Sequence, residues 1–144
     1  MLHLYKASCT RDNLKLIRQF VQAVLHDFKF QFSEIEINQL ILAVDEVCSN
    51  LIIYSHQCNP AESIEVRIHD LNEKVLFEII DRSTDQFNIK DYQEPDLQNI
   101  ISERRKGGLG LMLVNRIMDS VEVIYSNKEN TWQLSKNKSK KSNK

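Results

Sequence analysis

All three glycines of this chain lie at positions 107, 108 and 110, directly before an apolar helical pattern. Glycine lets the backbone approach a ligand closely or adopt a positive φ. A glycine turn that leads into a helix N-terminus presents unpaired N–H groups and the positive end of the helix dipole, which together bind anions such as phosphate. The same cluster is also compatible with a plain hinge before a core helix. The glycines therefore indicate either a phosphate site or a hinge.

A second pattern with chemical potential is the acid–amide pair Glu46 and Asn50, four residues apart in an apolar helical segment. Residues at this spacing project from the same face of a helix. A carboxylate can take a proton from an attacking hydroxyl or water. A carboxamide oxygen is a hard, neutral ligand that suits Mg²⁺. Such a pair is also typical of a solvated helix surface, so its meaning depends on what lies beside it.

Charged residues occur at two further positions of interest. Asp81 ends an apolar strand pattern, where a carboxylate can either point into a pocket or start a turn. Arg104, Arg105 and Lys106 immediately precede the glycines. Three cations beside a phosphate site would neutralise its charge, although a basic cluster on a surface loop explains them equally well.

Hydrophobic periodicity indicates the elements that must position these residues. Segments that alternate apolar and polar residues are predicted to be strands: 2–9, 63–69, 74–81, 120–126 and 131–135. Segments with a period near 3.6 are predicted to be helices: 11–29, 33–55 and the residues that follow the glycines. Ser33 and Glu36 have the spacing of a capping box.

The polar segment 82–106 separates the middle hairpin from the glycines, and residues 94–102 within it suit a short helix. A connection of this length in a compact domain is usually functional or mobile. The elements together predict an α+β fold, a two-layer sandwich with helices on one face of a mixed, mostly antiparallel sheet.

Size and charge limit the function classes. The chain has 144 residues, 42% of them apolar and 27% charged, which is ordinary for one soluble globular domain. The last nine residues hold five lysines and no acid, so the preceding 135 carry 14 basic and 20 acidic groups. We therefore expect a single domain over 1–135 and a disordered lysine-rich tail over 136–144. The acidic body argues against direct binding of nucleic acid.

The spacing of the cysteines and the length of the apolar segments indicate the cellular compartment of the protein. Cys9, Cys48 and Cys58 lack the spacing of metal ligands, and Cys48 falls in a helical pattern where a small buried residue is expected. The sequence shows neither a signal peptide nor an apolar run of membrane length. The expectation is a cytoplasmic protein that does not enter a membrane.

The order of these motifs resembles the GHKL ATPase superfamily, and more closely the small stand-alone anti-sigma-factor serine/threonine kinases of bacterial partner-switching systems. Val44-Asp-Glu-Val-Cys-Ser-Asn50 resembles their N box, and Ile80-Asp81 the start of their first glycine box. Residues 107–122 are similar to their second glycine box and the segment after it. The resemblance covers about residues 1–135 and implies the ATP-binding (Bergerat) fold of that superfamily.

The resemblance also implies roles for particular residues. Glu46 would be the general base for a serine hydroxyl, Asn50 the Mg²⁺ ligand, and Asp81 the acceptor for the adenine amino group. Gly108 and Gly110 would offer backbone N–H groups to the phosphates, Arg104 or Arg105 would reach the terminal phosphate, and the 82–106 loop would close as a lid. The implied ATP-binding residues are Asn50, Asp81, Arg105, Gly107, Gly108, Leu109 and Gly110.

Two positions depart from the family pattern. Ser83 stands where the first glycine box has glycine. Tyr54 stands where the family often has histidine, four residues after the asparagine, and His56 follows two residues later.

Two hypotheses for function follow. The first is a serine/threonine protein kinase that uses ATP, releases ADP and needs Mg²⁺. It would phosphorylate a small antagonist of the anti-anti-sigma (STAS) type and sequester a sigma factor or another regulator. The resemblance implies a homodimer, for which the first strand is a candidate edge. The second hypothesis, motivated by Ser83, is a binding module of the same fold that holds nucleotide weakly or not at all and acts by protein sequestration.

Overall fold

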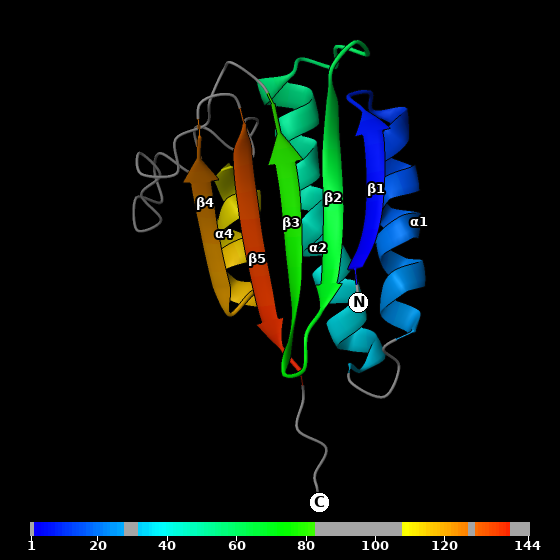
Figure 1. Ribbon diagram of the computed structural model, residues 1–144, viewed down its shortest axis with the longest axis vertical. Coiled ribbons are helices and arrows are strands. Elements are labelled where there is room, and N and C mark those ends of the chain that lie inside the picture. The colour runs from blue at the N-terminus through cyan, green and yellow to red at the C-terminus, as the bar shows by residue number, and fades with distance from the viewer. Residues whose placement is uncertain (1, 28–31, 83–107, 127–128, 139–144) are drawn as a thin grey trace, which may run out of the picture.

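The protein forms one sheet with helices on one of its faces (Figure 1). The computed structural model describes residues 2–27, 32–82, 108–126 and 129–138. The elements in chain order are β1 (Leu2–Ser8), α1 (Asp12–His26), α2 (Glu34–Ser49), the π-helix η1 (Asn50–Ser55), β2 (Ser63–Asp70), β3 (Lys74–Asp81), α4 (Gly108–Ile117), β4 (Ser120–Tyr125) and β5 (Asn130–Asn137). The strand order is β1-β2-β3-β5-β4, and all neighbours in it are antiparallel. The predicted two-layer α+β sandwich is confirmed, with a fully antiparallel sheet.

The central helical stretch begins as predicted. The Ser33 side chain accepts a hydrogen bond from the Glu36 backbone N–H at 3.1 Å, and the Ser33 N–H donates to Glu36 Oε1 at 2.8 Å. This capping box satisfies two N–H groups that the first turn of a helix leaves without a partner. The stretch continues to Ser55 but changes from α2 to η1 at Asn50. The first helix was predicted to reach residue 29 and ends at His26, while 28–31 and the short helix predicted over 94–102 lie outside the described residues.

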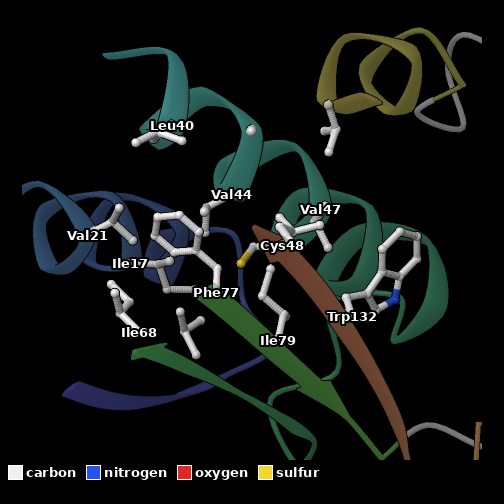
Figure 2. Close-up of a cluster of buried hydrophobic side chains, with 14 of the residues drawn as sticks. Ile17, Val21, Leu40, Val44, Val47, Cys48, Ile68, Phe77, Ile79 and Trp132 are labelled. Carbon is white, nitrogen blue, oxygen red and sulfur yellow. The ribbon is translucent and has the colours of Figure 1, made fainter. Parts of the chain in front are cut away.

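The core lies between the inner face of the sheet and α2. Figure 2 shows Phe77 and Ile79 of β3 pointing toward α2, from which Val44 and Cys48 approach. The largest side chains with under 2% exposure are Trp132, Phe77, Ile17, Leu25, Ile37, Leu40, Leu51, Ile52, Ile64, Ile68, Ile79 and Leu134. Each such side chain contributes roughly 1.5–3 kcal/mol through its burial. The predicted alternation of the strands is explained by this one buried face.

The central helix supplies much of this core. Residues Glu34–Ser55 form 22 helical residues that are apolar enough to cross a membrane by length and composition alone. Half of the most apolar window is buried inside the protein. The stretch lies between α1 and α4 over the sheet (Figure 1). Its apolar composition is therefore that of a core helix.

The outer face of the sheet is polar, and β1 is one of its two edge strands. Glu78 accepts hydrogen bonds there from His69 Nε2 at 2.7 Å and from Gln133 Nε2 at 3.1 Å. On β1, Leu2 and Leu4 are half exposed. The first strand is thus an edge strand with two apolar side chains in solvent.

The last strand is longer than predicted, which corrects the start of the lysine-rich tail. Lys136 and Asn137 pair with β3 and belong to β5. The Lys136 ammonium donates to the carbonyl of Ile117 at 3.0 Å, which satisfies one of the last carbonyls of α4. Residues 139–144 lie outside the described part of the chain.

Candidate functional site

Several predicted site residues come together where β3 ends, β5 begins and α2 passes into η1. Asp81 is the last residue of β3, and Asn50 is the first residue of η1. The first turn of α4, with Gly108, Leu109 and Gly110, begins at the same end of the sheet (Figure 1). Ser83, Arg104, Arg105 and Gly107 lie outside the described residues.

Gly110 packs directly against the Glu46 carboxylate. A Cβ at Gly110 would overlap Glu46 Oε1 and would stand 2.9 Å from its Cδ. No other residue type leaves room for the carboxylate at its present position. The packing of α4 on α2 thus places a carboxylate at the first turn of the helix that follows the glycines.

The surroundings of Glu46 alter its acidity. Burial raises the pKa of Glu46, and the adjacent Asp45 carboxylate raises that pKa further. Asp45 itself pairs with Arg18 of α1 at 3.0 Å. A general base works best when its pKa lies near the working pH, so a raised value suits Glu46 to accept a proton.

Asn50 is buried, and its side-chain amide oxygen lacks a hydrogen-bond partner within the described residues. The residue is only 4% exposed, and the oxygen in question is Oδ1. A buried acceptor in this condition costs about 1–3 kcal/mol, which a bound water or cation would offset. An amide oxygen fits Mg²⁺, which keeps most of its other positions for water and phosphate oxygens. The described residues contain no group of three or more His, Cys, Asp or Glu that could hold a metal.

Asp81 lies at the centre of a histidine–carboxylate cluster. His56 Nε2 donates to Asp81 Oδ1, and His56 Nδ1 donates to Glu62 Oε1. Burial alone would lower the pKa of His56, but the hydrogen bonds with Asp81, Cys9 and Glu62 outweigh it and raise the pKa to about 11. The ring is therefore an imidazolium at neutral pH, with a buried carboxylate on one side and a half-exposed one on the other.

The positions of His56 and Glu62 depend on the end of η1. The His56 backbone N–H bonds to the Leu51 carbonyl at 2.9 Å, an i→i+5 pattern. Gln57 and Cys58 then both have positive φ, 52° and 57°, which reverses the chain. The Cys9 N–H donates to the Glu62 carbonyl at 2.8 Å and fixes the returning segment beside β1.

This cluster predicts a pH-dependent stability. The folded-state pKa of His56, about 11, lies above its ordinary value of 6.5. The stabilisation is therefore fully present below about pH 6.5 and is lost as the pH rises toward 11, by up to about 1.4 kcal/mol per pH unit. Urea unfolding of the wild type and of His56→Gln from pH 6 to pH 10 measures it. The stability difference between the two proteins should shrink as the pH rises, and a constant difference would contradict the prediction.

Asn130 is a second buried amide at this end of the sheet. It opens β5, is 2% exposed, and pairs in register with Asp81 of β3. Its Oδ1 has no hydrogen-bond partner within the described part of the chain. Cross-strand partners project from the same face of a sheet. Asn130 is therefore a candidate ligand contact beside Asp81.

Three residues of this site were not predicted from the sequence: His56, Glu62 and Asn130. His56 was identified only as a departure from the family spacing, and its distance of six residues from Asn50 is the signal that could have pointed to a changed helix geometry. Asn130 lies just before the strand predicted over 131–135, where an asparagine is typical of a turn. Glu62 carries no local signal, since its partner is brought to it by the chain reversal after η1.

Comparison with known proteins gives a consistent picture. Residues 7–136 match the family described as the histidine kinase-like ATPase domain. The serine-protein kinase RsbW of Bacillus pumilus (strain SAFR-032) is 32% identical over 115 residues, 75% of this chain and 68% of that protein. The serine-protein kinase RsbW of Bacillus licheniformis is 24% identical over 122 residues, 82% and 74% of the two chains. The anti-sigma F factor of Clostridium perfringens (strain SM101 / Type A) is 23% identical over 103 residues, 72% and 73% of the two chains. The family match includes every described residue of the site.

Proposed function

Because the chain belongs to the histidine kinase-like ATPase domain family, we propose that it is an ATP-dependent serine/threonine protein kinase of an anti-sigma partner-switching system. The contact between Gly110 and Glu46 carries this proposal. It sets a proton acceptor at the first turn of a helix, where phosphate oxygens are bound by backbone N–H groups. A carboxylate and a phosphate site this close suit transfer of a phosphoryl group to a hydroxyl.

In the proposed mechanism, Glu46 accepts the proton of the attacking serine or threonine hydroxyl. Its raised pKa favours that role. The backbone N–H groups of the first turn of α4 would bind the phosphate oxygens, and Asn50 Oδ1 would hold Mg²⁺. Bound Mg·ATP supplies the transferable phosphoryl group, and the protein contributes mainly positioning and charge neutralisation. Asp81 would accept a hydrogen bond from the adenine amino group, and the family resemblance assigns phosphate contacts to Arg105 and Gly107.

The partners follow from the names of the relatives, which are a serine-protein kinase and an anti-sigma factor. The substrate in this proposal is a serine or threonine of a small STAS-type antagonist, and the sequestered protein is a sigma factor. The protein acts in the cytoplasm. A homodimer forms with β1 at its interface, because β1 is a sheet edge and exposes Leu2 and Leu4.

Thermal unfolding with Mg²⁺, with and without millimolar ATP or ADP, tests the nucleotide site. A ligand at about 100 times its Kd adds about 2.7 kcal/mol to the free energy of unfolding, which is several degrees for a domain of this size. In Asn50→Ala the shift that depends on Mg²⁺ should vanish, because the buried amide oxygen is gone.

The matched control is Asn72→Ala, the same change at an exposed position in the turn between β2 and β3, at the opposite end of the sheet. That variant should keep the full shift. A wild type without any shift at millimolar nucleotide would overturn the kinase proposal and support the binding module that acts by sequestration alone.

A further inference from the structure

His56 connects the interior of the site to its rim. Its side chain is 1% exposed and lies between Asp81, also 1% exposed, and Glu62, which is 46% exposed. The titratable groups that face the ring come from three elements: Cys9 after β1, Glu62 before β2, and Asp81 at the end of β3. The imidazolium is the cation that the described part of the structure places against the Asp81 carboxylate.

A buried carboxylate needs hydrogen-bond donors to offset the loss of its contacts with water. A ring N–H of His56 supplies one such donor and fixes the plane of the Asp81 carboxylate. A carboxylate has about four acceptor sites, so the bond to His56 leaves capacity for a ligand N–H group. Since Glu62 holds the opposite nitrogen, the ring cannot rotate away from Asp81 without losing a second bond.

We propose that His56 is a positioning residue for nucleobase recognition, which holds Asp81 as a fixed acceptor and thereby selects a purine with a 6-amino group. The proposal rests on the proposed function, because it assigns the adenine amino group as the partner of Asp81. The chemical consequence is selectivity: a purine that presents no donor at this position loses the hydrogen bond to this acceptor. The role is one of positioning, because the described side-chain contacts of His56 are with Asp81 and Glu62.

The test compares the affinities for Mg·ATP and for Mg·purine riboside triphosphate, which lacks the 6-amino group. Calorimetry on the full chain should show the wild type binding ATP about tenfold or more tightly than the analogue. In His56→Gln this ratio should fall to about two or less, mainly through weaker ATP binding, because glutamine has neither the charge nor the second ring N–H. Affinity for the analogue should change little.

His69→Gln is the matched control. His69 also pairs with a carboxylate, Glu78 Oε1 at 2.7 Å, but on the outer face of the sheet and at its opposite end. Its loss should leave the ATP preference unchanged. If His56→Gln does not fold, Glu62→Ala provides the test at a half-exposed position, where loss of the Nδ1 partner should reduce the preference about threefold.

The outcomes separate the two proposals. A wild type that binds neither triphosphate overturns the proposed function and this inference with it. A wild type that binds both triphosphates equally overturns the inference alone, since Asp81 then does not recognise the amino group. A wild type that prefers ATP, with His56→Gln or Glu62→Ala keeping the full preference, also leaves the nucleotide site intact and removes His56 from base recognition.

Discussion

The Glu46→Gln variant is expected to lose phosphoryl transfer by a factor of at least about 100 while it still binds Mg·ATP. Glutamine has the shape of glutamate and fits beside Gly110 in the same way, but its amide cannot accept the proton of an attacking hydroxyl. General-base catalysis contributes about 10²–10⁴-fold to a rate. The measurement is single-turnover transfer from γ-labelled ATP to a STAS-type antagonist protein.

The control for this experiment is Glu34→Gln, the same change at an exposed position in the first turn of α2. Its transfer rate should equal that of the wild type. Thermal stabilisation by Mg·ATP should be similar in all three proteins, which would show that only the chemical step has changed. A Glu46→Gln protein with the full rate would remove Glu46 from the mechanism.

Gly110→Ala is expected to lower phosphoryl transfer by about 100-fold with little loss of stability. The new Cβ takes the space of the Glu46 carboxylate, which must swing away. That movement costs little, because it involves the flexible end of a side chain, and alanine favours a helix over glycine by up to about 1 kcal/mol. A displacement of about 1 Å in a catalytic group is nevertheless enough for a 100-fold loss. Transfer is measured at saturating ATP, so that weaker nucleotide binding does not contribute.

Two further variants identify the cause of this loss. Asn115→Ala, at an exposed position of the same helix, should be as active as the wild type. The double variant with Glu46→Gln and Gly110→Ala should be no slower than Glu46→Gln alone, because both changes remove the same carboxylate from its place. A further 100-fold loss in the double variant would mean that Gly110 acts independently of Glu46.

The local features of the fold could be predicted from the sequence. The Ser33–Glu36 capping box involves residues three apart, and alternation along β2 and β3 directly reflects one buried face. The start of the last strand was predicted at residue 131, whereas β5 begins at Asn130. Ser126 closes the turn before β5 by donating to the Glu129 carbonyl at 2.9 Å, so Asn130 enters the strand. A run of turn-forming residues does not reveal which of them joins the ladder.

The site was less predictable than the fold, because its contacts join distant segments. The family resemblance suggested that Glu46 and the glycines serve one site. That a single Cβ at Gly110 would collide with Glu46 depends on how closely α4 packs on α2, which no local pattern encodes. The pairing of His56 with Asp81 was not foreseen, since the apolar residues Leu51–Ile53 look the same in an α-helix and in a π-helix.

The spacing between Asn50 and His56 carries information of its own. Each residue turns an α-helix by about 100°, so the deletion of one residue from η1 would rotate His56 away from Asp81 while leaving Glu46 and Asn50 in place. The proposed metal-ligand half and the proposed base-recognition half of the site are thus separable by a change in length alone. An alignment that scores only residue identity would match Tyr54 to the family histidine and pass over the histidine that contacts Asp81. In this chain the count of residues in one helical turn is as much a determinant of the site as the residues themselves.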